Sequence, residues 1–384
     1  MDTLFDEVER SFKGPANHNE NSYDYYNRSA RANVSIVRRK LNEWYNDYPD
    51  IEKKELKSRF KKEFNSAFYE LFIFHFFKKL GFSIAIHPKI SNSSKRPDFL
   101  LKKDDIEIYV EAKIDKGKSK EKEALERKID ELYDNLSKIK LKGFVLQIDT
   151  IHFKNKNQPN SKRINRYLEE KINVLDSTYL RAAFEAQGYS AIHSIEYEDD
   201  DILIKVEPIP IAISAQDADY PAIGAYPSKF LLGGGEDTIR SSINKKAKRY
   251  GKLNKPFLLC LNALNEKTSG ESDVENAIWG SEALSFSDDP SHRDHRWVRK
   301  WDGIFINEKG PRLKNLSGVL ITKVYPFNIP NANYWLFEHP FTENKLDFKA
   351  LGVKYSYLKD SRIAKATGQD LDEIFSIPKD WLKH

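Results

Sequence analysis

The sequence predicts a mixed α/β protein in which a central sheet is flanked by helices. Its first half alternates helical and strand patterns in the order helix, strand, strand, strand, helix, strand, which is typical of α/β folds. Hydrophobic residues make up 40% of the 384 positions, enough for a sizeable core. We therefore expect an N-terminal helical segment at 1–50, a core at 51–175, and a C-terminal α+β region at 176–384 that extends the core sheet.

Two long helices are expected before the first strand. The first covers about 23–48, and the second runs from about 51 to 80, with Gly81 at its end. Apolar residues recur in the second helix at spacings of three and four, which predicts a buried stripe. Glu70 lies within this stripe or at its margin, where an unpaired carboxylate is costly. It is either a rim glutamate answered by Lys78 or Lys79, or a residue with a chemical role.

A strand at 84–90 precedes a hairpin at about 97–113, whose turn is formed by a run of charged residues. Pairing of the two hairpin strands would bring Asp98 opposite Glu111. Glu111 and Lys113 are two positions apart, so they project from the same face of a strand. Two carboxylates and a lysine would then share a small area of surface. This pattern indicates a metal site with a lysine beside it, and the simpler alternative is a cross-strand ion pair.

A helix at about 121–136 and a buried strand at 143–148 follow the hairpin, and Gln147 lies on that strand. The segment 154–166 is basic and contains no acid, so it is either a surface that contacts a polyanion near the site or a solubilising connector. Its candidate nucleic-acid-binding residues are Lys154, Lys156, Lys162 and Arg163.

A second basic segment begins with a helix near residue 238. No acid occurs from 240 to 255, and an apolar stripe predicts that one side of the helix packs on a sheet. A basic helix held in this way is a plausible contact for a phosphate backbone. The candidate residues for that contact are Arg240, Lys245, Lys248 and Arg249.

Several classes of protein are disfavoured by composition. A single cysteine, Cys260, excludes an intramolecular disulfide and a cysteine-based zinc cluster, and its apolar surroundings predict a buried strand residue. The first residues lack the pattern of a signal peptide, and the longest apolar run, 71–77, is too short to span a bilayer. We expect a cytoplasmic protein that does not bind membranes.

Glu70 on a helix, Pro97-Asp98, and Glu111-Ala112-Lys113 occur in the order that resembles the PD-(D/E)XK nuclease superfamily, which has the restriction-endonuclease-like fold. The resemblance covers roughly residues 60–150. It implies that Mg²⁺, replaceable by Mn²⁺, is bound by Asp98, Glu111, the Ala112 carbonyl and Glu70. It also implies a catalytic role for these acids and for Lys113, to which we add Gln147 as a residue that could bind the water or the phosphate.

The chemistry of phosphodiester cleavage is consistent with this resemblance. A hard divalent cation neutralises charge on the phosphate and lowers the pKa of an attacking water, and Mg²⁺ takes oxygen ligands. We therefore expect a metal-dependent endonuclease that cuts nucleic acid, with DNA favoured over RNA as the substrate. Its expected setting is prokaryotic restriction or antiviral defence. A homodimer is compatible with the resemblance. The alternatives are a catalytically idle nucleic-acid-binding or scaffold protein with this fold, and a metal hydrolase that acts on another substrate.

Overall fold

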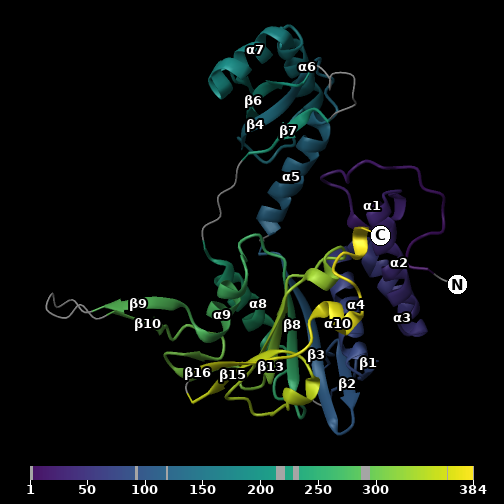
Figure 1. The fold of residues 1–384 in the computed structure, drawn as a ribbon, viewed down its shortest axis with the longest axis vertical. Helices are drawn as coiled ribbons and strands as arrows, with labels where there is room; N and C mark the ends of the chain where they lie inside the picture. Colours follow the sequence, from purple (N-terminus) through teal and green to yellow (C-terminus); the bar gives the residue numbers. More distant parts are fainter. Residues whose placement is uncertain are drawn as a thin grey trace. The chain divides into compact units, whose positions relative to one another are not determined.

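The computed structural model describes residues 3–90, 94–117, 120–212, 221–227, 233–286, 295–360 and 362–383. The chain divides into two compact units (Figure 1). Unit 1 consists of Met1–Gly14, Asn21–Gly117 and Leu231–His384, and unit 2 consists of Pro15–Glu20 and Lys118–Phe230. These boundaries differ from the expected ones at 50 and 175, because most of unit 2 is inserted into the sequence of unit 1.

Unit 1 is built on a mixed eight-stranded sheet with the strand order β1-β2-β3-β8-β13-β14-β15-β16. The mixed α/β class with a large sheet flanked by helices is therefore confirmed. The strands are β1 (Ser83–Ile86), β2 (Phe99–Lys103), β3 (Ile106–Asp115), β8 (Phe257–Ala263), β13 (Gly318–Thr322), β14 (Tyr334–Glu338), β15 (Tyr355–Lys359) and β16 (Arg362–Ala366). Five of them lie beyond residue 256, so the expected 51–175 segment holds only part of the sheet.

Helices cover both faces of this sheet. One hydrophobic cluster packs α2, α3, α4 and α10 against one face, and a second cluster packs α8 and α9 against the other. Strand residues alternate between the two clusters, as the two-residue period of a strand requires; Val110 belongs to the first and Tyr109 to the second. The helices of unit 1 are α1 (Ser22–Arg28), α2 (Ala32–Asn46), α3 (Asp50–Lys62), α4 (Phe64–Lys79), α8 (Gly235–Ala247), α9 (Glu271–Trp279) and α10 (Leu371–Phe375).

The centre of the sheet joins strands that are far apart in sequence. β3 pairs in parallel with β8, and parallel strands need a long crossover connection. That connection contains unit 2 and then α8. β8 is buried along its whole length, as expected for a strand covered on both faces, and Cys260 is fully buried within it.

The expectation that the 143–148 strand joins the core sheet is wrong. β4 (Phe144–Phe153) lies in a four-stranded sheet of unit 2, between β6 and β7, and the strand beside β3 is β8. Both β4 and β8 have a strand-like pattern, so local sequence does not distinguish their partners. Gln147 therefore faces Glu207 across the β4–β6 ladder and not a residue of β3.

The helix expected at 51–80 is interrupted. α3 ends and α4 begins at Glu63, whose backbone is extended out of the helical region (φ −137°, ψ 57°). Likewise, the helix expected at 23–48 is divided into α1 and α2. Neither interruption is at a proline or glycine, so tertiary packing and not local propensity decides the break.

Unit 2 is a second α/β unit with its own hydrophobic cluster. The order of its sheet is β5-β6-β4-β7, and its helices are α5, α6 and α7. Their bounds are α5 (Lys120–Leu136), α6 (Ser161–Ile172), α7 (Ser177–Gln187), β5 (Ile195–Glu198), β6 (Ile202–Pro210) and β7 (Ile223–Ala225). The expected basic loop at 154–166 is thus partly helical, because the Asn160 side chain accepts the Arg163 N–H and caps α6.

Two small two-stranded sheets complete unit 1. They pair β9 (Glu282–Phe286) with β10 (His295–Arg299), and β11 (Ile306–Asn307) with β12 (Gly310–Pro311). Within the described ranges, no helix is both long and apolar enough to cross a membrane.

Candidate functional site

The β2–β3 hairpin places its acids as the sequence predicts. The turn residue Asp104 adopts a left-handed backbone conformation (φ 50°), which a two-residue hairpin turn favours. The ladder runs to the Phe99–Val110 pair, so Asp98 lies opposite Glu111 one position beyond it. The Ala112 backbone N–H donates a 2.7 Å hydrogen bond to Asp98 Oδ2, which fixes this carboxylate against β3.

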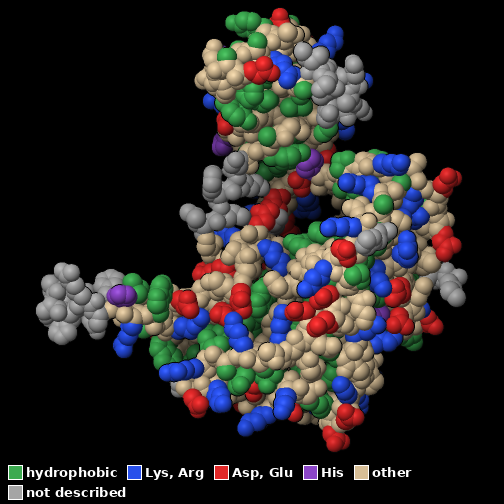
Figure 2. All heavy atoms as spheres, viewed as in Figure 1, with side chains coloured by type: hydrophobic (Ala, Val, Ile, Leu, Met, Phe, Trp, Pro, Cys, Tyr) green, Lys and Arg blue, Asp and Glu red, His purple; other side chains and the backbone are tan. Residues whose placement is uncertain are grey.

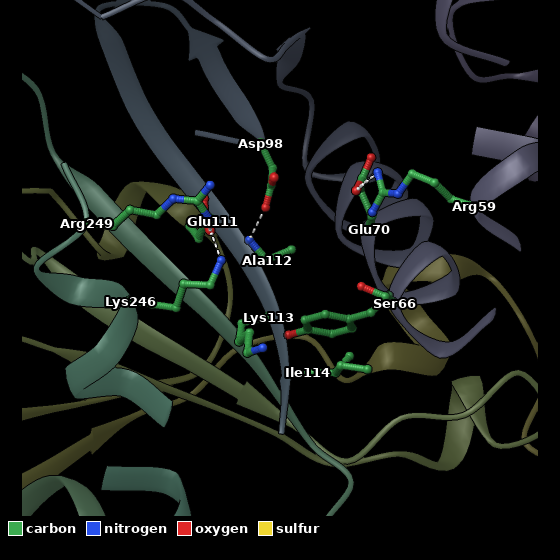
Figure 3. A pocket seen from close by; sticks show the side chains of 11 residues that line it. Arg59, Ser66, Glu70, Asp98, Glu111, Ala112, Lys113, Ile114, Lys246 and Arg249 are labelled. Carbon is green, nitrogen blue, oxygen red and sulfur yellow. Dashed lines mark hydrogen bonds and ion pairs between the residues drawn. The ribbon is translucent and has the colours of Figure 1, made fainter. Parts of the chain in front are cut away.

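A cavity of about 170 Å³ in unit 1 brings the predicted residues together (Figure 3). α4 borders it on one side and the end of α8 on the other, with β3 between them. Three acids and four cationic residues contribute to its wall, so the pocket carries both signs of charge at close range. The lining residues are Arg59, Ser66, Tyr69, Glu70, Asp98, Glu111, Ala112, Lys113, Ile114, Lys246 and Arg249.

Glu111 is the most heavily contacted acid of the pocket. Its side chain is 1% exposed, and Oε1 accepts from Lys246 Nζ at 2.5 Å and from Arg249 Nη1 at 2.9 Å. The Tyr250 hydroxyl contacts Oε2. Burial and the Glu111 charge raise the pKa of Tyr250, so the phenol stays protonated and can donate. The end of α8 therefore compensates the charge of this buried carboxylate.

Asp98 lacks a comparable cationic partner among the described residues. Burial and the charges of Glu111 and Glu70 together raise the pKa of its carboxyl to about 7, although the Ala112 hydrogen bond and the charge of Lys246 act in the opposite direction. The effect of neighbouring acids on Asp98 indicates that positive charge is in short supply at this point of the pocket.

The ion-pair partner of Glu70 lies on α3 and is not Lys78 or Lys79. The Arg59 guanidinium lies 2.6 Å from Glu70 Oε2, and the Tyr48 hydroxyl donates to Oε1 at 3.1 Å. In a straight helix, residues 59 and 70 would lie about 16 Å apart along the axis. The break at Glu63 separates α3 from α4, so the two helices can pack with Arg59 beside Glu70.

Lys113 faces the same pocket without forming the cross-strand ion pair that was the simpler alternative. Within the described part of the chain, its ammonium makes no ion pair with Asp98 or Glu111. Burial and the nearby Lys246 lower the pKa of Lys113, while Asp115 and Glu111 act in the opposite direction. A lowered pKa increases the neutral fraction of the amine, which is the form that accepts a proton.

The pocket does not present a ready-made cluster of metal ligands. Among the residues that the structure describes, no group of three or more His, Cys, Asp or Glu side chains is arranged to hold a metal ion. The three acids are divided between the two sides of β3, since Glu70 is on α4 and Glu111 contacts the end of α8.

The other predicted residues are distributed over both units. Gln147, Lys154, Lys156, Lys162 and Arg163 belong to unit 2, whereas the pocket belongs to unit 1. Lys154 Nζ forms an ion pair with Glu198 Oε1 at 2.7 Å and donates a hydrogen bond to the Asp199 carbonyl at 2.6 Å. The remaining three basic residues are exposed.

The predicted basic residues of α8 and of the segment directly after it have different roles. Arg240 contacts Asp237 and Asp302 and also bonds to the Asn276 carbonyl, so it holds the helix to its surroundings. Arg249 reaches Glu111, whereas Lys245 and Lys248 are exposed. Figure 2 shows Lys and Arg side chains intermingled with Asp and Glu over the visible face of unit 1.

Sequence reasoning missed Lys246, Tyr250, Arg59 and Tyr48 as partners of the buried acids. For the first two, a signal was available. Lys246, Arg249 and Tyr250 are spaced by three and four positions, so they project from one side at the end of the helix. Arg59 and Tyr48 have no such signal, because their contacts depend on how α2, α3 and α4 pack.

Replacing Arg59 by alanine is expected to lower the free energy of unfolding of unit 1 by about 2 to 3 kcal/mol, because Glu70 would be left as a buried charge with Tyr48 as its one donor side chain among the described residues. All six tryptophans lie in unit 1, so unfolding in urea followed by tryptophan fluorescence reports this unit. The double variant Arg59→Ala/Glu70→Gln should recover part of the loss. An unchanged unfolding midpoint in Arg59→Ala would show that the ion pair contributes no stability.

No protein-family model, no curated protein and no solved structure matches this chain.

Proposed function

We propose that this chain is a Mg²⁺-dependent nuclease whose active site is the pocket beside β3. The observation that carries the proposal is the convergence of Glu70, Asp98, Glu111 and Lys113 on one cavity. These residues come from a helix and a hairpin in the order that the PD-(D/E)XK resemblance implies. The order helix, strand, strand, strand, helix, strand is completed by α8 and β8, which supports a restriction-endonuclease-like core.

The donor atoms of the pocket fit a Mg²⁺ ion bound through two carboxylates. Mg²⁺ is usually held by one or two carboxylates, with water and substrate oxygens completing its shell. One oxygen of Asp98 accepts a hydrogen bond from the Ala112 N–H. Burial and the adjacent acids raise the pKa of this carboxyl to about 7, so a cation there would relieve the repulsion between the acids. Asp98 and Glu111 would hold the ion, with the Ala112 carbonyl as a third oxygen and Glu70 as a further ligand.

Bound Mg²⁺ would neutralise charge on the phosphate and lower the pKa of an attacking water. Lys113 would orient this water and accept its proton, which its lowered pKa favours. Arg249 and Lys246 would bind the phosphate from the α8 side, since cationic side chains stabilise the charge that develops in the transition state. DNA is the proposed substrate, and prokaryotic restriction or anti-phage defence is the proposed setting.

A second candidate is a catalytically idle nucleic-acid-binding protein. The observation in its favour is that Lys246, Arg249 and Tyr250 already occupy both carboxylate oxygens of Glu111. In such a protein the α8 cations would hold a structural carboxylate permanently, and the pocket would bind phosphate without cutting it.

Incubation of the purified protein with labelled DNA and RNA, with Mg²⁺ and with a chelator, separates these candidates. The nuclease should cut at least one nucleic acid only in Mg²⁺, and Asp98→Asn should abolish the cut. Binding without cleavage under all these conditions would support the idle protein. Binding that does not weaken with salt would contradict both, because contacts with phosphates release counterions.

A further inference from the structure

The two cations at the end of α8 converge on a single oxygen of Glu111. Lys246 Nζ and Arg249 Nη1 both contact Oε1 (Figure 3), whereas the Tyr250 hydroxyl contacts Oε2. The carboxylate is almost completely buried, so water does not provide alternative partners. A metal ion that uses Oε1 must therefore displace at least one of these two cations.

Lys246 also acts on the second acid. Burial, Glu111 and Glu70 raise the pKa of Asp98, and the positive charge of Lys246 opposes this rise, although no cationic side chain is bonded to Asp98 among the described residues. The Lys246 ammonium thus provides positive charge to both Glu111 and Asp98, which are the two acids proposed to hold the divalent ion. In the metal-free protein this ammonium compensates part of the charge that the ion would compensate.

Both cationic side chains are partly exposed, so they have room to turn away from Glu111. The Lys246 side chain is 22% exposed and that of Arg249 is 38% exposed, so both reach the surface of the pocket. Lys246 is in the last turn of α8, and Arg249 follows its end. The contacts that anchor this region are made by the buried residues Ile243, Ala247 and Tyr250, which need not move when the cations rotate.

We propose that Lys246 and Arg249 form a phosphate subsite that exchanges partners with Glu111. Without metal, the two cations bind Glu111; when a divalent cation takes Oε1, they turn to a phosphate of the nucleic acid. This inference rests on the proposed function. Because each ligand frees the residues that the other needs, the metal and the nucleic acid strengthen each other's binding by the same factor.

The chain provides a matched control at the same end of α8. Lys245 and Lys248 carry the same total charge as Lys246 and Arg249, but they are exposed and do not line the pocket. At about 0.15 M salt the Debye length is about 8 Å, so exposed charges outside the pocket act weakly on Glu111. The two double variants Lys246→Ala/Arg249→Ala and Lys245→Ala/Lys248→Ala therefore distinguish contact with Glu111 from a general effect of charge.

The experiment uses the full chain with Lys113→Ala in every protein, which prevents cleavage during the measurement. Calorimetric titration measures Mg²⁺ affinity without nucleic acid, and fluorescence anisotropy measures binding of a labelled oligonucleotide with Mg²⁺ and with a chelator. For the parent, Mg²⁺ should tighten oligonucleotide binding about tenfold, within the usual range of coupling between sites.

In the Lys246→Ala/Arg249→Ala protein, Mg²⁺ should bind about tenfold more tightly than in the parent, because Glu111 has lost its competing cations, and Mg²⁺ should no longer tighten oligonucleotide binding. The Lys245→Ala/Lys248→Ala protein should bind the oligonucleotide less tightly by the same factor in both conditions, with an unchanged Mg²⁺ affinity. Should the alanine variant not fold, judged by tryptophan fluorescence, Lys246→Gln/Arg249→Gln makes the same test.

Two results would overturn the proposed exchange of partners. One is a Mg²⁺ affinity of the Lys246→Ala/Arg249→Ala protein that equals that of the parent or is weaker; the other is Mg²⁺ that still tightens oligonucleotide binding in this variant. This failure is distinct from that of the nuclease proposal. A parent with intact Lys113 that cuts DNA, beside a variant with unchanged coupling, refutes only the exchange. Coupled binding of Mg²⁺ and oligonucleotide by a protein that never cuts refutes only the nuclease.

Discussion

Replacing Lys113 by alanine is expected to reduce Mg²⁺-dependent cleavage by about a thousandfold while the protein stays folded. Within the described residues Lys113 is the amine of the pocket that forms no ion pair, and its pKa is lowered by burial and by Lys246. A side chain that transfers a proton in the transition state typically contributes a factor of about 10² to 10⁴. Initial rates of cleavage of a labelled DNA duplex measure the effect.

Lys116→Ala is the matched control for this prediction. Lys116 lies three positions further along the chain and is exposed, so its removal changes the net charge equally without touching the pocket. Its cleavage rate should stay within about twofold of the parent. If Lys113→Ala cuts as fast as the Lys116 variant, Lys113 has no catalytic role, and the pocket must be assigned differently.

Asp98→Asn is expected to stabilise unit 1 at pH 8 by about 2 to 4 kcal/mol in the presence of a chelator. The carboxyl has a pKa of about 7 in the folded chain against an ordinary value of 3.8, because it is buried beside Glu111 and Glu70. The folded state then holds the proton more tightly than the unfolded state. The group's contribution to stability is fully present below about pH 4 and is lost as pH rises through about 7.

The asparagine variant removes this dependence, since its amide oxygen can still accept the Ala112 N–H but carries no charge. Urea unfolding followed by tryptophan fluorescence at pH 5 and pH 8 should show a smaller difference between the two pH values for the variant than for the parent. Asp105→Asn in the exposed hairpin turn serves as the control and should leave the difference unchanged. A parent that is equally stable at both pH values would contradict the raised pKa of Asp98.

The two acids of the hairpin differ in how the protein compensates their charge. Glu111 is compensated by Lys246 and Arg249, so its burial need not weaken the fold. Asp98 is not compensated in this way, and its charge is unfavourable in the metal-free protein. Buried groups with strongly perturbed pKa values cluster at functional sites, which favours Asp98 as a residue of the active site.

The sequence by itself determined the local features of the site. The alternation of 106–113, the charged turn and the two-residue period of a strand were sufficient to place Asp98 opposite Glu111 and Lys113 beside Glu111. The apolar stripe around Glu70 placed that acid at the core side of its helix or at its margin, and the structure shows that it is buried. The inward stripe of α8, which ends at Tyr250, also followed from spacing alone.

Only the tertiary structure decided which distant segments meet at this site. Pairing of β3 with β8 spans the whole of unit 2, and a strand-like pattern at 143–148 competes with it in the sequence. The partners of the buried acids also come from afar, since Arg59 reaches Glu70 across a helix break and Lys246 reaches Glu111 across 135 positions. Hydrophobic periodicity fixes which face of an element is buried, but it does not encode the element that covers this face.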